Sequence, residues 1–264
     1  MAYDDELAVA LDLADRAMHR IATSRPATVG TKAHAADLVT ETDHEDERIV
    51  RDVLGTRFPD HAIVGEEQGG APAAGDGLTW YVDPVDGTTN YASGLPWCSF
   101  SLALARGDQP VLGVVADPFR GEVLSAVADG PALCNGAPVR CRDATGLAGE
   151  IVVTEWAAYE PWPGMTGMLH SLGAEMCTTR IMGSSALSLV SVAAGRAAGG
   201  VLGKFHAIDG LAAAFIASRA GAVVLDENAT PTLFPSSGGI LVAAPDVAET
   251  IWRAWRQAPT KGPW

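Results

Sequence analysis

Residues 80–94 read WYVDPVDGTTNYASG, and this stretch decides how the rest of the chain is interpreted. The apolar run from Trp80 to Val82 predicts a buried strand that delivers Asp83, and Pro84 fixes the local backbone before Asp86. Asp-Pro and Asp-Gly are also common turn dipeptides, so a plain β-turn is the competing interpretation. A sharp turn here can aim both carboxylates at one point, while the N–H groups of the following Gly-Thr-Thr face an anion.

Paired carboxylates of this kind suit hard divalent cations. Mg²⁺ takes oxygen ligands, usually one or two carboxylates together with waters and substrate phosphate. Two such ions about 3.5 to 4 Å apart can clamp a phosphoryl group and activate a water. Glu66 and Glu67 follow a short apolar run in the segment VGEE and supply further acids. The competing interpretation of adjacent glutamates is a solvated surface pair, which is their commonest fate.

The composition is that of a compact globular protein. The chain has 264 residues, of which 48% are hydrophobic and 19% charged, and no apolar run approaches the roughly 20 residues of a membrane span. The formal charge of -14 opposes the phosphate backbone of nucleic acid, so we expect no nucleic-acid partner. The first 20 residues lack the basic start and cleavage site of a secretory signal, so we expect a cytoplasmic location and no membrane contact.

The pattern along the chain predicts two αβ halves. Residues 1–145 begin with an amphipathic helix, continue into a second helix that starts near Thr42 or Asp43, and then form closely spaced strands. Residues 146–264 alternate short strands with Ala-rich helices such as 186–194. No long Ser/Pro linker separates the two halves, so we expect them to share a cleft.

Taken together, the motifs resemble one known family, the inositol monophosphatase-like metal-dependent phosphatases, which are related to histidinol-phosphatase and fructose-1,6-bisphosphatase. The resemblance rests on segments that occur in the family's order: DLVTETD (37–43), VGEE (64–67), WYVDPVDGTTNY (80–91), GVVADP (113–118), CNG (134–136), GSSAL (183–187) and IDGLAAAFIASRAGAVV (208–224). It implies an α/β fold of alternating layers, an αβαβα sandwich of the inositol monophosphatase/fructose-1,6-bisphosphatase type, often assembled as a homodimer.

The resemblance also implies a set of metal ligands. Glu66, Asp83 and the backbone carbonyl of Val85 would bind one Mg²⁺, and Asp83, Asp86 and Asp209 would bind a second. A third, weaker ion would depend on Glu66. From the residue pattern alone, Asp209 could also be the N-cap of the Ala-rich helix that follows it. The resemblance thus implies two or three Mg²⁺ ions in each active site.

Further residues match the family's catalytic positions. Asp43 and Thr88 correspond to the pair that orients the attacking water, and Glu66 would share in catalysis through its metal. The backbone amides of Gly87 and Thr88 correspond to a phosphate cradle at a helix N-terminus. Lys32 lies in a Gly-Thr loop, where a solvated lysine and a member of the family's basic loop both stay open as interpretations.

The expected substrate rim combines Gly183, Ser184, Ser185, Leu202 and Lys204. In inositol-specific members an acid stands at the position of Leu202 and contacts substrate hydroxyls, which an apolar side chain cannot do, so a different preference is expected here. The predicted reaction is hydrolysis of a small polyol, sugar or amino-alcohol monophosphate, such as inositol 1-phosphate or histidinol phosphate. The alternatives are a non-catalytic metal- and phosphate-binding regulatory protein of the same fold, and a phosphatase for fructose 1,6-bisphosphate or a 3′-phosphonucleotide.

Overall fold

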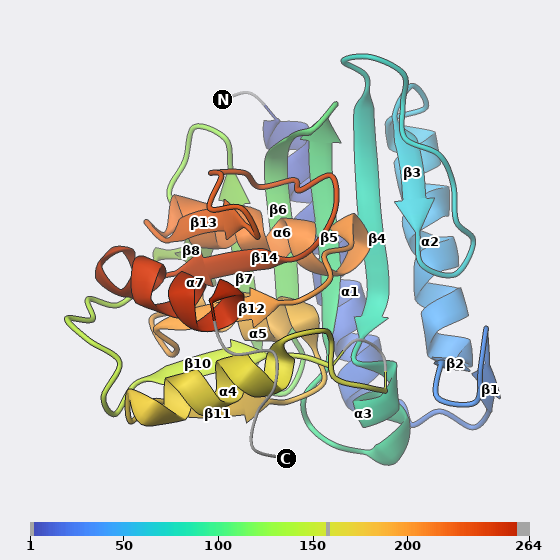
Figure 1. Cartoon of the computed structure of the whole chain (residues 1–264). Helices are drawn as coiled ribbons and strands as arrows, with labels where there is room; N and C mark the ends of the chain where they lie inside the picture. The colour runs from blue at the N-terminus through green and yellow to red at the C-terminus, as the bar shows by residue number, and fades with distance from the viewer. Residues whose placement is uncertain (1–2, 157–158, 258–264) are drawn as a thin grey trace.

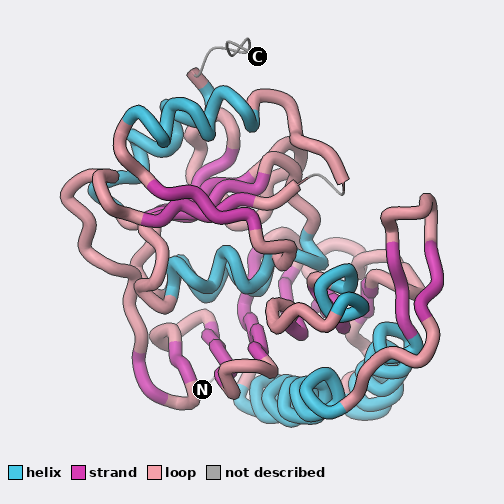
Figure 2. The backbone as a smooth tube through the Cα atoms, turned by 90° about the horizontal axis from the view of Figure 1, so that it is seen from below, coloured by secondary structure: helices cyan, strands magenta, loops and turns pink. Residues whose placement is uncertain are grey.

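A computed structural model describes residues 3–156 and 159–257 of the chain. The secondary structure forms five layers that alternate helix, sheet, helix, sheet and helix, as Figure 2 shows. The expected αβαβα architecture is therefore confirmed. Among the helices of the described residues, none combines the length and the apolar character that a membrane crossing requires.

Two helices form the first layer, α1 (Asp4–Thr23) and α2 (Glu41–Arg57). In α1 the buried side chains of Val9, Leu13 and Ala17 recur every four residues and form one apolar stripe. This stripe packs on the first sheet, behind which α1 lies in Figure 1. The amphipathic helix predicted at the start of the chain is thus present.

The first sheet contains seven strands in the order β3-β4-β5-β6-β7-β8-β9. Their bounds are β3 (Ala62–Gly65), β4 (Leu78–Asp86), β5 (Ser99–Arg106), β6 (Gln109–Asp117), β7 (Glu122–Val127), β8 (Leu133–Cys134) and β9 (Ala137–Pro138). Only the β3–β4 pair is parallel within this sheet. Helices cover both faces of β4, β5 and β6, which is why these strands are apolar runs rather than alternating patterns.

A second sheet of five strands has the order β11-β10-β12-β14-β13. The bounds are β10 (Ile151–Thr154), β11 (Thr178–Ile181), β12 (Gly199–Leu202), β13 (Val223–Asp226) and β14 (Ile240–Ala243). Between the two sheets lie α5 (Ser185–Ala193) and α6 (Ala207–Arg219), and the outer layer holds α4 (Met165–Ala174) and α7 (Ala248–Arg256), preceded by the short 3-10 helix η1 (Pro245–Val247). Because α5 and α6 are enclosed, most of their residues are buried, which explains their small apolar side chains. The boundary expected near residue 145 falls between the two sheets, and the division into two domains stays a prediction.

Two small elements border the future site, the hairpin of β1 (Val29–Thr31) and β2 (Leu38–Thr40) and the short helix α3 (Thr88–Ser93). The N-cap of α2 was expected at Thr42 or Asp43, and this prediction was wrong by two or three residues. Thr40 is the N-cap, and its backbone N–H donates to Asp43 Oδ2 at 2.9 Å in a capping box. The N-cap of α6 is His206, so Asp209 lies in the first turn and the capping alternative for Asp209 was also wrong.

Candidate active site

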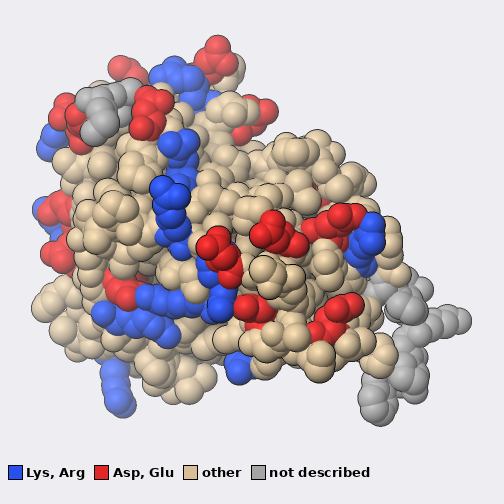
Figure 3. Space-filling view, turned by 90° about the vertical axis from the view of Figure 1, so that its left-hand side faces the viewer, with Lys and Arg blue, Asp and Glu red and all other residues tan. Residues whose placement is uncertain are grey.

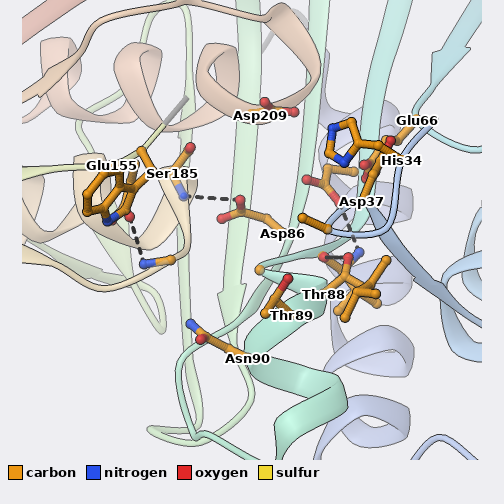
Figure 4. Close-up of a pocket in the computed structure, with 17 residues that line it drawn as sticks. His34, Asp37, Glu66, Asp86, Thr88, Thr89, Asn90, Glu155, Ser185 and Asp209 are labelled. Carbon is orange, nitrogen blue, oxygen red and sulfur yellow. Dashed lines mark hydrogen bonds between the residues drawn. The ribbon is translucent and has the colours of Figure 1, made fainter. Parts of the chain in front are cut away.

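A cavity of about 460 Å³ opens where β4 ends, beside α3 and the first turn of α6 (Figure 4). It is lined by residues that come from both halves of the chain. Of the residues predicted from the sequence, those on its wall are Glu66, Asp83, Val85, Asp86, Gly87, Thr88, Gly183, Ser185 and Asp209. The fold thus brings together carboxylates that are more than 140 positions apart in the sequence.

A β-bulge turns two of the carboxylates toward the cavity. In a regular strand, residues three apart point to opposite faces of the sheet. Here Asp83 pairs with Ser101 and Asp86 pairs with Ser99, so three steps along β4 are matched by two along β5. The extra residue corrects the phase, and both carboxylates reach the same cavity. Pro84 lies within this bulge, where a missing backbone N–H is tolerated.

The carboxylate of Asp86 is held by the segment that starts α5. Its Oδ1 accepts a hydrogen bond from the Ser185 backbone N–H at 3.1 Å, and its Oδ2 accepts one from the Ala186 N–H at 2.8 Å. The hydroxyls of Ser184 and Ser99 also donate to Oδ2. Ser184 is fully buried and does not line the cavity, so its predicted place at the substrate rim is corrected: it positions Asp86.

The turn that carries Glu66 is held by hydrogen bonds to a buried carboxylate of α2. Glu47 accepts hydrogen bonds from the backbone N–H groups of Glu67 at 2.6 Å and Gln68 at 3.0 Å. Lys32 Nζ lies 2.7 Å from Glu66 Oε1 and 2.7 Å from Glu67 Oε1. The alternatives of a solvated glutamate pair and a solvated lysine were therefore wrong. Burial lowers the pKa of Lys32, but attraction to the two glutamates outweighs it, so the net pKa is raised and the ammonium stays charged.

The acids on the cavity floor repel one another. Burial, followed by the charges of Asp86 and Glu66, raises the pKa of Asp209 to about 8. Burial and the neighbouring acids, Glu66 first among them, raise the pKa of Asp83 well above its ordinary value. Burial also raises the pKa of Asp86 to about 6, against the lowering effect of the hydrogen bonds it accepts. Ionising all of these buried, neighbouring carboxylates costs free energy, and a bound cation would offset that cost.

The donor set fits a hard divalent cation. Glu66, Asp83, Asp86 and Asp209 offer carboxylate oxygens, and Val85 offers a carbonyl beside them, which are the ligand types that Mg²⁺ prefers. The charge of Glu66 is, after burial, the largest cause that raises the pKa of Asp83, so these two predicted ligands lie close enough to interact strongly. Within the residues that the structure describes, no three acidic, histidine or cysteine side chains already surround one point at ion-binding distance.

A second polar pair lies at the start of α3. Thr88 Oγ1 is 3.0 Å from Asp43 Oδ1 and 3.0 Å from the carbonyl oxygen of Val85. Asp43 is fully buried behind Thr88, and this burial raises the pKa of its carboxyl against the hydrogen bonds that it accepts. Gly87 has a φ of 95°, and a Cβ there would lie 2.7 Å from the carbonyl oxygen of Gly183. Glycine is therefore required at the turn that exposes the α3 amides.

Two of the predicted rim residues lie away from the cavity wall. Leu202, 4% exposed, belongs to the apolar core around α5 and α6. Lys204 is exposed on the segment after β12, and its charge lowers the pKa of Asp209 without lining the cavity. The predicted contacts of these two side chains at the rim are therefore corrected: Leu202 faces the core, and Lys204 acts on the site only through its field.

The sequence interpretation missed Glu155 and Trp156, which follow β10 and line the cavity. Glu155 accepts hydrogen bonds from the Gly183 N–H at 2.7 Å, the Met182 N–H at 3.3 Å and Ser188 Oγ at 2.6 Å. Burial raises its pKa to about 7. The signal was present in VVTE, an apolar strand that runs into an acid, as VGEE does.

The fold is a layered α/β sandwich, its cavity is lined by carboxylates, and Gly87 leaves the backbone amides at the start of α3 accessible. This combination is typical of proteins that bind cations together with an anionic ligand. Comparison with known proteins identifies the class further. Residues 3–260 match the model of the inositol monophosphatase family. "Nus factor SuhB" of Pasteurella multocida is 34% identical over 217 residues, 81% of each chain, and "Inositol-1-monophosphatase" of Synechocystis sp. is 32% identical over 235 residues, 86% of this chain and 80% of the relative.

Solved structures agree with this comparison. The IMPase of Thermotoga maritima superposes with a TM-score of 0.86 at 28% identity, covering 96% of this chain and 97% of that one. The chain belongs to the inositol monophosphatase family, whose members are metal-dependent phosphatases that act on small phosphorylated substrates.

Proposed function

We propose that this protein is a Mg²⁺-dependent phosphomonoesterase for a small monophosphate of the polyol, sugar or amino-alcohol type. The observation that carries the proposal is the convergence of Glu66, Asp83, Asp86 and Asp209 on one cavity beside the Asp43–Thr88 pair. These four carboxylates and the Val85 carbonyl would hold two or three Mg²⁺ ions. Bound Mg²⁺ would supply positive charge to the phosphate and lower the pKa of a water.

The remaining catalytic work falls to residues of the chain. Thr88 Oγ1 can accept a proton from the attacking water while it donates its own to Asp43 Oδ1, 3.0 Å away. Burial raises the pKa of Asp43, which makes this carboxylate a better proton acceptor. The amides of Gly87 and Thr88 would bind phosphate oxygens at the start of α3. Glu66 would contribute to catalysis through the metal that it holds.

The wall of the cavity favours one phosphate over two. Among its described lining residues there is no lysine or arginine, although a second phosphate would need such a charge. Gly183 and Ser185 both line the cavity, and Figure 4 shows Ser185 on the other side of Asp86 from Glu66. We expect both to contact the substrate near its phosphate. A fructose bisphosphate or 3′-phosphonucleotide substrate is therefore the weaker candidate.

A second candidate function is that of a non-catalytic regulatory protein that binds metal and phosphate. One observation favours it, the similarity to relatives that are named Nus factor SuhB. Independence from nucleic acid accordingly stays a prediction that needs its own binding assay. On the face shown in Figure 3, basic and acidic side chains lie beside one another.

A cytoplasmic location and a homodimeric assembly are likewise predictions from the sequence, and sedimentation would test the assembly.

The decisive experiment measures phosphate release from inositol 1-phosphate, histidinol phosphate, sugar phosphates and nucleotides, each with Mg²⁺ and with EDTA. We expect release that requires Mg²⁺, and its loss in Asp209→Asn, which removes a ligand charge without changing side-chain volume. Asp12→Asn is the matched control, because Asp12 is an exposed aspartate of α1 outside the cavity. Wild-type release by Asp209→Asn would refute the ligand assignment. Binding of inorganic phosphate with no release from any ester would favour the regulatory candidate.

A further inference from the structure

The upper walls of the cavity hold polar side chains that are already engaged with the protein's own backbone. Glu155 accepts the N–H groups of Met182 and Gly183, and Asn90 Nδ2 donates to the carbonyl oxygens of Met182 at 2.6 Å and of residue 97 at 2.8 Å. Asp37 Oδ2 accepts the N–H of residue 33 at 3.1 Å. A hydroxyl-rich leaving group gains specificity only from polar partners that are available to it. The side chains of Glu155, Asn90 and Asp37 are therefore less available to the hydroxyls of a substrate than unpartnered groups would be.

Two residues with flat rings also line the cavity. Trp156 lines the cavity and is 48% exposed. Burial of a tryptophan ring against another group is favourable, so this exposed ring is a candidate contact for a ligand. His34 also lines the cavity, from the connection between β1 and β2. Figure 4 shows Glu155, the residue before Trp156, and His34 on opposite sides of Asp86. Two ring-bearing segments thus flank the carboxylate floor.

A ring contact fixes one of these two walls. Tyr159 meets His34 edge to face, with ring centroids 4.9 Å apart and an interplanar angle of 83°. The imidazole ring of His34 therefore has an aromatic neighbour that restricts its orientation. Tyr159 is itself 62% exposed and adjoins the lining residue His34, while the floor of the cavity is acidic. A flat ring in the ligand is the chemical partner that aromatic side chains recognise.

We propose that the leaving group of the substrate carries a flat aromatic or heteroaromatic ring, which lies between Trp156 and His34 while the phosphate occupies the carboxylate floor. This inference rests on the proposed phosphatase function and specifies its substrate class. The cavity volume of about 460 Å³ is sufficient for a phosphate ester of one ring. Trp156 is then a specificity-determining residue that contacts the substrate without taking part in the reaction.

Benzyl phosphate and cyclohexylmethyl phosphate provide the test, because both are esters of primary alcohols and differ in the flatness of the ring. We expect the wild-type protein with Mg²⁺ to favour benzyl phosphate in kcat/KM by about three- to tenfold, which is what one aromatic contact supplies. Trp156→Ala should reduce this ratio to about one, and Trp156→Phe should retain most of it. The inhibition constant of inorganic phosphate should not change in either variant.

Phe119→Ala is the matched control, since Phe119 is 43% exposed and lies outside the cavity; it should keep the wild-type ratio. Hydrolysis of both esters without preference, or an unchanged ratio in Trp156→Ala, would overturn the aromatic subsite and leave the phosphatase proposal standing. Failure to release phosphate from any ester with Mg²⁺, inositol 1-phosphate included, would overturn both.

Discussion

Removal of the charge of Asp209 should stabilise the metal-free protein while it abolishes phosphatase activity. Asp209 lies in the first turn of α6 and faces Asp86 and Glu66 across the cavity floor. Its carboxylate accepts no hydrogen bond from the described residues that would offset this repulsion. Asparagine has the same shape and no charge, so Asp209→Asn relieves the repulsion without opening a space.

The size of the effect follows from the pKa of Asp209, which rises from 3.8 to about 8 in the folded protein. Between these two values the unfolded state binds fewer protons than the folded state, so the free energy of unfolding falls as pH rises through this window. At pH 7 only the part of the shift between 3.8 and 7 contributes, which would correspond to about 4 kcal/mol. Because the side chain faces a solvent-accessible cavity and shares its protons with neighbouring acids, we expect roughly half of this, about 2 kcal/mol.

Urea unfolding in EDTA at pH 7 would measure the difference. A gain of about 2 kcal/mol should move the midpoint of Asp209→Asn upward by about 0.7 M relative to the wild type. The gain should shrink as pH falls and vanish below about pH 3, where both states hold the proton. Saturating Mg²⁺ should stabilise the wild type by RT ln(1 + [Mg²⁺]/Kd) and stabilise the variant less. If Asp209→Asn unfolds at lower urea than the wild type in EDTA at pH 7, the argument from the burial of this charge and its repulsion by Asp86 and Glu66 is wrong.

Other substitutions test separate parts of the site. Asp43→Asn should lower kcat by about 100-fold or more with little change in KM, because Asp43 lies behind Thr88; steady-state kinetics at saturating Mg²⁺ would show this, and an effect on KM alone would contradict it. Ser184→Ala should weaken Mg²⁺ binding several-fold in calorimetry, since it removes a hydrogen bond to a predicted ligand. Gly183→Ala should cost roughly 1–3 kcal/mol in urea unfolding, because φ is 89° and an amide side chain lies 2.8 Å from the new Cβ; Gly149→Ala, with φ 78° and open space, should cost less.

Much of the fold was predictable because the layers leave a strong mark on the sequence. The apolar stripe of α1 and the continuous apolar runs of the central strands follow directly from what each element buries. The exact start of α2 was not predictable from a list of good N-cap residues. Thr40, Thr42 and Asp43 are all suitable, and the choice was made by the hydrogen bond from Thr40 to Asp43.

The candidate site was predictable where a residue acts through its own charge, and less so where it acts through backbone contacts. The floor carboxylates stand in recognisable motifs, whereas the substrate rim depended on which way a strand residue faces. Leu202 ends β12 and packs into the core, so alignment alone placed it wrongly at the rim. Glu47 and Glu155 look like ordinary charged residues, but each is buried and holds the backbone N–H groups of a turn that carries site residues.

The carboxylates of the cavity and the residues that hold them together suggest how an acidic protein could bind an anion. Serines and backbone amides hold Asp86, and Glu47 holds the turn that carries Glu66. Burial and the neighbouring acids raise the pKa values of Asp83 and Asp209, so the charge of the floor is not balanced by the protein itself. With a net charge of -14, the chain would repel phosphate unless cations occupy the floor first. Under the proposed function, the burial and mutual repulsion of these carboxylates would make cation binding favourable, and the bound cations would in turn make phosphate binding favourable.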